Sequence, residues 1–220
     1  MIKRLGGALL SLSLLTACSD APGPQQTLET TIRGANAATL SSDANFALVA
    51  AVDHGGSLWD LSSGERLFDW NHQQGGYTTL NHTRFSKDNR LAVTASPFDL
   101  VLWSIETGEP QWYWKTPDEI HDIDLVSDGR YALLGLDNAE AVIFDIQQGG
   151  VLKRMYHPAS VRSVAINAEG TLALTGADDY VARLWDVTNE TMLFERAFTN
   201  QIDTVALAPN NQFAFSAETL

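Results

Sequence analysis

Cysteine is nearly absent from this sequence: Cys18 is the only one among 220 residues. A single cysteine cannot form a disulfide within the chain, so an internal disulfide is excluded as a source of stability. The composition offers another source, because 45% of the residues are hydrophobic. That fraction is ordinary for a globular protein with a real core.

Positive charge is also scarce. The chain has 14 Lys and Arg residues against 27 Asp and Glu residues, which gives a formal net charge of −13. A surface this acidic repels phosphate backbones unless its cations are clustered, and the sequence contains no run of Lys and Arg. Nucleic acid is therefore not an expected partner.

Motifs of catalysis are missing as well. There is no GxSxG, no P-loop and no GxGxxG before a helix. Five histidines are scattered without HExxH or other metal spacing: His54, His72, His82, His121 and His157. We expect no catalytic residue, no metal, no cofactor and no small-molecule substrate, and therefore no enzyme.

One short segment invites a metal or acid–base interpretation, namely residues 121–124 (His-Asp-Ile-Asp). We favour an inner β-strand in which Ile123 and Leu125 pack inward and the polar residues lie at its rim. Three tryptophans, Trp70, Trp112 and Trp114, end predicted outer strands. Packing between repeats is their expected use, and a platform for a cofactor or partner is the alternative.

The N-terminus has the organisation of a secretory signal. Lys3 and Arg4 form a basic segment, and residues 5–14 form an apolar segment. That segment is too short for a transmembrane helix, which needs roughly 20 apolar residues. It ends in Leu15-Thr16-Ala17-Cys18, which resembles the lipobox of bacterial lipoproteins. The resemblance implies cleavage after residue 17 and lipidation of Cys18; an ordinary secretory signal with a chance cysteine is the alternative.

The residues after the cysteine predict where the protein is held. In lipoproteins of this type an Asp directly after the cysteine favours retention in the inner membrane, so Ser19 favours the outer membrane, facing the periplasm. Residues 18–26 are polar and rich in Pro and Gly, so we expect a lipidated cysteine followed by a flexible tether. The predicted organisation is a signal peptide (1–17), the tether (18–26) and a folded domain (27–220).

The domain repeats itself. Four segments place an aromatic residue between apolar and acidic or polar ones, and these aromatic positions are 44, 41 and 41 residues apart: Trp59, Trp103, Phe144 and Trp185. A second series of short apolar segments has nearly the same period, and a polar turn precedes each of its members. Each unit resolves into four short strands, which in the fourth unit are 161–166, 171–176, 181–187 and 191–198. Four-stranded units at this period predict an all-β fold, a β-propeller of about four and a half blades.

Blade four carries the most specific resemblance. Residues 157–186, from His157 through Leu184-Trp185-Asp186, closely resemble the WD40 consensus. In that family a His of the loop between blades, a Ser or Thr of the second strand, an Asp of the next turn and the Trp form a buried hydrogen-bonded tetrad. Matched residue by residue, the resemblance implies a structural tetrad of His157, Thr175, Asp179 and Trp185.

The other blades depart from that pattern. Thr31 stands in blade one where the His is expected, and blade two has Gly76 there and a shortened turn. Blade three has Phe144 in place of Trp and Thr116 in place of His. We therefore predict the tetrad for blade four alone.

A second kind of propeller has to be weighed. Residues 107–112 (Thr-Gly-Glu-Pro-Gln-Trp) resemble the TGxxxW element of quinoprotein-type repeats, which is also found in outer-membrane lipoproteins that assist barrel assembly. The element occurs once in full, whereas the apolar–Trp–Asp ending occurs twice intact and twice altered, so we favour WD40. A quinoprotein-like or outer-membrane-assembly-type propeller lipoprotein is the alternative.

In a propeller, function resides in the loops at the ends of the blades. One end gathers the turns between second and third strands and the loops between blades. We expect this surface to bind another envelope protein through histidine, aromatic and acidic side chains: His72, Tyr77, Phe98, Asp137, Asp178 and Tyr180. The predicted function is a lipid-anchored, non-catalytic WD40 scaffold for protein–protein interaction.

The last repeat also carries an expectation. It ends after its second strand, and residues 27–32 align with an outer strand that would close the ring. We therefore expect the propeller to be incomplete at the C-terminus. The alternative is a short protein that completes itself by strand exchange with a second copy.

The lipidation prediction is directly testable. Cys18→Ala removes the thiol that would be acylated, so the variant should stay uncleaved or be released from the membrane. Metabolic labelling with a fatty-acid analogue measures this: the wild type and the control Ser19→Ala should carry the label, and Cys18→Ala should not. Equal labelling of Cys18→Ala and wild type would overturn the lipobox interpretation.

Overall fold

The structure, a computed structural model, describes residues 27, 29–31, 33–52, 54–208, 211 and 214–218. The predicted signal peptide, Cys18 and the predicted tether lie outside the described residues. Within the part of the chain that is described, no helix has the length and apolar character needed to cross a membrane.

Short strands joined by turns account for the regular structure of the described residues. Blades one and two consist of β1 (Ala35–Leu40), β2 (Phe46–Ala51), β3 (Gly55–Asp60) and β4 (Glu65–Trp70), then β5 (His82–Phe85), β6 (Leu91–Ala95), β7 (Asp99–Ser104) and β8 (Pro110–Lys115). Blades three and four consist of β9 (Ile120–Leu125), β10 (Tyr131–Leu136), β11 (Glu140–Asp145) and β12 (Val151–Tyr156), then β13 (Val161–Ile166), β14 (Leu172–Ala177), β15 (Val181–Asp186) and β16 (Thr191–Ala197). A further sheet contains β17 (Ile202–Leu207) and β18 (Ala214–Glu218).

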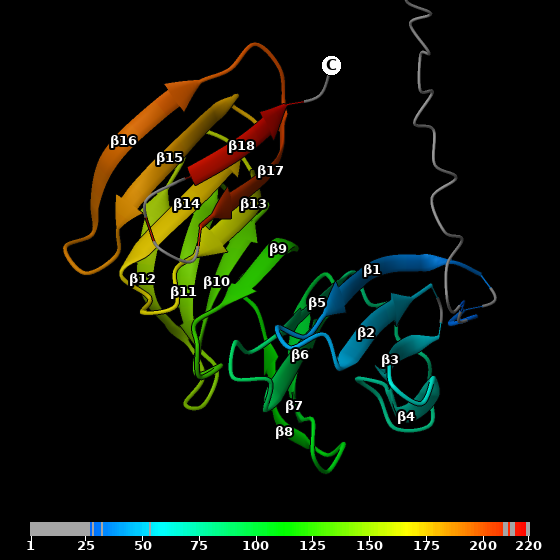
Figure 1. Cartoon of the computed structure of the whole chain (residues 1–220). Helices are drawn as coiled ribbons and strands as arrows, with labels where there is room; N and C mark the ends of the chain where they lie inside the picture. Colours follow the sequence, from blue (N-terminus) through cyan, green and yellow to red (C-terminus); the bar gives the residue numbers. More distant parts are fainter. Residues whose placement is uncertain are drawn as a thin grey trace, which may run out of the picture.

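Each blade is an antiparallel meander in which every strand pairs with the next one along the chain. The first strands of successive blades contact one another, from β1 through β5, β9 and β13 to β17. The fourth strands β4, β8, β12 and β16 lie at the periphery (Figure 1). The predicted all-β propeller is confirmed, with four four-stranded blades and one sheet of two described strands.

The aromatic residues that recur in the sequence occupy equivalent places in the four blades. An aromatic residue of the third strand lies opposite an alanine of the second strand in every blade: Trp59 and Ala47, Trp103 and Ala92, Phe144 and Ala132, Trp185 and Ala173. Opposed side chains project from the same face of a sheet, so the small alanine leaves room for the ring. The period in the sequence therefore corresponds to the same aromatic–alanine contact, repeated once in each blade.

The residue that follows the aromatic residue stabilises the turn between the third and the fourth strand. In blade three the Asp145 carboxylate accepts hydrogen bonds of 2.9 Å from the backbone N–H groups of Gln147 and Gln148. An Asp side chain that binds backbone two or three residues ahead is a common way to fix a turn. The acidic member of the Trp-Asp ending thus has a local structural role.

Hydrophobic side chains form layers between successive blades. One layer joins blade one to blade two and includes Leu48, Trp70 and Trp103. The next layers join blade two to three and blade three to four. The blades approach closely, because a Cβ added to Gly135 would lie 2.8 Å from the carbonyl oxygen of Val161 in the next blade. Small residues on the second strand are therefore required by the stacking.

The outer strands are fastened to the following blade by hydrogen bonds. Trp70 of β4 donates its indole N–H to the Gly108 carbonyl at 2.9 Å, and Trp114 of β8 donates to the Ile146 carbonyl at 2.6 Å. In blade three a lysine of β12 does the same toward blade four. Trp70 and Trp114 are thus used for packing between blades, whereas Trp112 stays exposed.

Residues 121–124 form part of the inner strand β9, as predicted, with Ile123 and Leu125 buried. The polar side chains do more than lie at its rim. Asp122 accepts a hydrogen bond of 3.0 Å from the Val164 backbone N–H, and Asp124 accepts one of 2.9 Å from the Ile166 backbone N–H. These carboxylates tie β9 to β13, and no group of metal-ligating side chains is found among the described residues.

The segment 27–32, which we expect to act as the outer strand that closes the ring, is described only in part. Its described residues, 27 and 29–31, have no regular secondary structure. A strand needs a pairing partner, and the expectation of an incomplete propeller places that partner outside the sequence. Closure of the ring by this segment therefore stays a prediction.

Candidate functional site

One end of the propeller gathers the turns between second and third strands and the loops between blades. We call it the loop face and define it by residues 96–98, 137–139 and 178–180 together with loops 71–81, 116–119 and 157–160. Backbone hydrogen bonds join loops to turns, for example from the Asp178 N–H to the Ser160 carbonyl at 2.9 Å and from the Ile120 N–H to the Pro97 carbonyl at 2.7 Å. These hydrogen bonds hold the loops and turns of the loop face in place relative to one another.

Three of the six residues predicted to bind a partner are exposed aromatic side chains of the loop face. They are Tyr77 of the loop after β4, Phe98 of the β6–β7 turn and Tyr180 of the β14–β15 turn. Tyr77 stacks on the exposed ring of His54, with ring centroids 4.7 Å apart and planes 7° apart. The structure thus presents aromatic surface to solvent from three different blades.

Asp137 and Asp178, also predicted, belong to a chain of charged groups across the loop face. His121 Nε2 lies 2.9 Å from Asp137 Oδ1 and 2.9 Å from Arg162 Nη1, and Arg162 Nε donates to Asp178 Oδ2 at 2.8 Å. Hydrogen bonds from His121 and Ser160 lower the pKa of the Asp137 carboxyl, and the hydrogen bond with Asp178 raises the pKa of Arg162. These acidic groups are therefore held in fixed positions.

His72, the sixth predicted partner residue, lies inside blade two, where its side chain is 1% exposed. Its Nδ1 is hydrogen-bonded to the Asp99 carboxylate, and its Nε2 accepts a hydrogen bond of 2.8 Å from the Thr94 hydroxyl. The Trp103 Nε1–H donates to the same hydroxyl oxygen at 2.8 Å. The side chain of His72 is thus enclosed, although the residue lines the pocket described below. His72, and not Gly76, takes the place of the tetrad histidine in blade two.

The predicted tetrad of blade four is connected differently. Thr175 is hydrogen-bonded to His157 Nε2 at 2.8 Å and accepts from the Trp185 Nε1–H at 3.0 Å. Asp179 binds the Arg183 guanidinium instead, with distances of 3.1 and 2.6 Å. A carboxylate and a guanidinium form two charge-assisted hydrogen bonds, which together are stronger than one bond to a neutral imidazole. Arg183 therefore separates Asp179 from the other three residues.

Blades one and three lack a threonine at the position of Thr94 and Thr175, and they meet the needs of the third-strand aromatic residue in other ways. In blade one the second strand has Val49, and the Trp59 Nε1–H donates to the Ser57 hydroxyl at 2.8 Å. In blade three Leu134 and Phe144 are both buried, and phenylalanine has no N–H that needs a partner. Each blade thus avoids a buried N–H without a partner, either because a hydroxyl accepts from the indole or because phenylalanine replaces tryptophan.

Loop length explains why the sequence did not reveal the blade-two network. His157 lies four residues before β13, whereas His72 lies ten residues before β5. The shortened turn places Asp99 four positions before Trp103, whereas Asp179 lies six positions before Trp185 in blade four. The one constant signal is a threonine nine or ten residues before the tryptophan, which identifies both Thr94 and Thr175.

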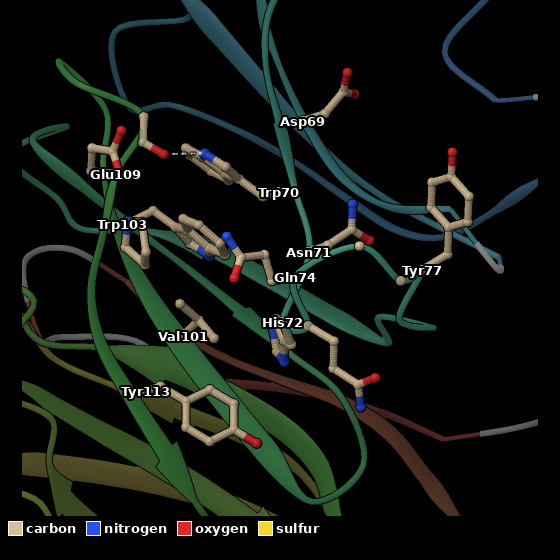
Figure 2. A pocket seen from close by; sticks show the side chains of 15 residues that line it. Asp69, Trp70, Asn71, His72, Gln74, Tyr77, Val101, Trp103, Glu109 and Tyr113 are labelled. Carbon is tan, nitrogen blue, oxygen red and sulfur yellow. Dashed lines mark hydrogen bonds between the residues drawn. The ribbon is translucent and has the colours of Figure 1, made fainter.

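A pocket of about 750 Å³ lies beside the loop face, between blades one and two (Figure 2). Its floor contains the indoles of Trp70 and Trp103, which stack with centroids 5.0 Å apart and planes 7° apart. Both indole N–H groups are already committed, one to the Gly108 carbonyl and the other to the Thr94 hydroxyl. The two tryptophans therefore offer the pocket no hydrogen-bond donor.

The walls of the pocket are polar. They include Tyr113, the side-chain amides of the loop after β4 and two carboxylates, and no lysine or arginine is among the lining residues. Figure 2 shows Gln74 reaching from the loop toward the indole pair and Glu109 beside the same pair. Glu109 belongs to the TGxxxW element, whose Gly108 has a positive φ of 73° and leaves no room for a Cβ against Phe68.

The comparison with known families concerns blade four. Residues 150–186 match the family model described as WD domain, G-beta repeat. This part of the chain is similar to a WD40 repeat. The matched repeat is one of four blades with the same topology, so the match and the fold together support a propeller of the WD40 type. WD40 domains commonly mediate protein–protein interactions and are generally non-catalytic scaffolds. No curated protein sequence matches the chain.

The network of blade two should contribute measurably to stability. Thr94→Val preserves the side-chain shape but leaves the Trp103 N–H and His72 Nε2 without a partner, so the free energy of unfolding should fall by about 1–3 kcal/mol. Chemical denaturation measures this loss. The double variant Thr94→Val/Val101→Ser supplies a hydroxyl where blade one has Ser57 and should recover part of it. An unchanged free energy in Thr94→Val would contradict a stabilising role.

His157 should make stability depend on pH. Burial, assisted by the charge of Arg183, lowers the pKa of His157 from 6.5 to about 4. Between these pH values the unfolded chain binds a proton that the folded protein does not. Stability should therefore fall by roughly 3 kcal/mol as the pH drops from 6.5 to 4, and this contribution should be constant above pH 6.5.

Thermal denaturation over that pH range, with His157→Gln as the test variant, measures this contribution. Burial also lowers the pKa of His82, so the informative quantity is the difference between the wild-type and variant slopes. His157→Gln should have the smaller slope, and His54→Gln, a change at an exposed histidine, should keep the wild-type slope. The same slope in all three proteins would contradict the prediction.

Proposed function

We propose that this protein is a lipid-anchored, non-catalytic scaffold of the bacterial cell envelope that binds another envelope protein through the loop face. The propeller provides a rigid support for the loops. Lipidated Cys18 and the tether attach that support to a membrane, which we propose to be the outer membrane on its periplasmic side.

Exposed aromatic surface is the observation that carries the proposal. Tyr77, Phe98 and Tyr180 expose 69%, 55% and 49% of their surface. An exposed aromatic ring stabilises no core, while aromatic residues are enriched where protein interfaces are fully buried. The fixed carboxylates of Asp137 and Asp178 lie on the same face and are suited to a polar rim.

The proposed anchor is supported by the sequence of the N-terminus. Leu15-Thr16-Ala17-Cys18 follows a basic and an apolar segment, which is the order found in lipoprotein precursors. Acyl chains hold a protein at a membrane without a transmembrane helix, since each buried methylene contributes about 0.8 kcal/mol. Ser19, in the place of an Asp, supports the outer membrane.

Capture of a partner by full-length lipidated protein, followed by a binding measurement with the purified partner, tests the proposal. Phe98→Ser/Tyr180→Ser removes two exposed aromatic side chains from the loop face and should weaken binding about tenfold or more, the size expected for interface anchors. Leu152→Ser/Tyr156→Ser removes two side chains of β12 that are 56% and 67% exposed, and serves as the matched control.

Both double variants should melt like the wild type, because the substituted side chains lie outside the core. Undiminished binding by the control, together with the loss in the loop-face variant, would support the proposal. Failure of lipidated wild type to bind any envelope protein, or equal losses in the two variants, would contradict it.

A further inference from the structure

The pocket between blades one and two has a one-sided charge. Asp69 and Glu109 line it, and among its lining residues there is no lysine or arginine to balance them. Side-chain amides of Asn71, Gln73 and Gln74 add carbonyl oxygens that accept hydrogen bonds. An anionic ligand would meet repulsion here, whereas a cation with several N–H donors would find acceptors on more than one side.

Aromatic rings complete this environment. Tyr113 is 47% exposed at the pocket and offers it a ring face, while Trp70 and Trp103, which are 1% and 4% exposed, close its floor. A cation is attracted to the face of an aromatic ring, and the planar guanidinium of arginine also stacks on it. An ammonium group is compact and more strongly hydrated, so it gains less from such a surface. The shape and chemistry therefore favour a guanidinium over an ammonium.

The chain already uses this combination beside the pocket. The guanidinium of Arg66 lies 4.9 Å from the centre of the Trp59 ring and donates to Asp69 Oδ1 at 2.9 Å. One guanidinium thus engages an indole face and a carboxylate at the same time. Arg66 itself does not line the pocket, so the arrangement leaves the pocket open.

Glu109 is the carboxylate with no competing partner. Asp69 is shared with Arg66, whereas among the described residues no hydrogen-bond donor or cation engages the Glu109 side chain. Only the backbone of Glu109 is bonded: its N–H donates to the Thr107 hydroxyl, and its carbonyl accepts from the Ser104 N–H. The side chain lies at the β7–β8 turn beside the indole pair (Figure 2). A ligand cation that enters the pocket would pair with Glu109.

We propose that this pocket binds the guanidinium of an arginine side chain presented by a protein partner. The inference rests on the proposed scaffold function and specifies which side chain of the partner the scaffold would bind. The loop that carries Tyr77 of the loop face also carries Gln73 and Gln74 of the pocket, so one partner can contact both. The net charge of −13 adds long-range attraction for a basic segment.

Three short peptides test the proposal against full-length protein in detergent. They have the form acetyl-Gly-Gly-X-Gly-Gly-amide, where X is arginine, lysine or citrulline, the uncharged isostere of arginine. Titration followed by ligand-observed NMR gives an apparent Kd for each. The arginine peptide should bind about fivefold or more tightly than the citrulline peptide, with lysine between them.

Protein variants then locate the site. Glu109→Gln should weaken binding of the arginine peptide about fivefold and leave the citrulline peptide unaffected, because only the charge interaction is lost. Glu65→Gln is the control, since it makes the same change at an exposed residue of β4 outside the pocket. Equal affinity for arginine and citrulline, or the same effect of Glu109→Gln and Glu65→Gln, would overturn the proposal.

The partner assay separates this inference from the scaffold function. If wild type and Glu109→Gln bind the envelope partner equally well, the arginine pocket is wrong and the scaffold function stands. If the arginine peptide binds with the expected selectivity but no envelope protein does, the scaffold function is wrong and the pocket stands. Weaker binding of both peptide and partner by Glu109→Gln supports the two together.

Discussion

A blade of this propeller has two apolar faces and cannot bury both without a neighbour on each side. The layers between blades follow from this constraint, as do the small residues, such as Gly135, that let neighbouring sheets approach. The third-strand tryptophans pack in or against these layers with little or partial exposure, so each indole N–H needs a partner inside its own blade. The hydroxyls of Ser57, Thr94 and Thr175 provide that partner.

The fold could be predicted because its two periods appear directly in the sequence. Alternation of apolar and polar residues gives the strands, and the interval between aromatic residues gives the blades. The predicted strand 171–176, for example, differs from β14 (Leu172–Ala177) by one residue at each end. The closing role of segment 27–32 is of another kind, because an interval along the chain contains no information about which strand lies beside it, and it stays a prediction.

The candidate site was predicted less completely, because its residues come together through loops of unequal length and through competing ion pairs. The sequence pattern assigned Gly76 to the histidine position of blade two, while the ten-residue separation between His72 and β5 places His72 inside that blade. Asp179 was assigned by its position, but Arg183 attracts it more strongly. The pocket needs register across two blades, which no local pattern encodes.

Among the described residues, the side-chain hydrogen bonds that join an outer strand to another blade run forward, from one blade to the next along the chain. A chain that folds from its N-terminus therefore cannot fasten Trp70 until Gly108 is in place, and Trp114 has to wait for Ile146. Every blade is completed about one repeat after its own strands have formed, so a partly folded array always carries one unfinished outer strand at its C-terminal end. A fault in one blade would also leave the outer strand of the preceding blade without its hydrogen-bond partner.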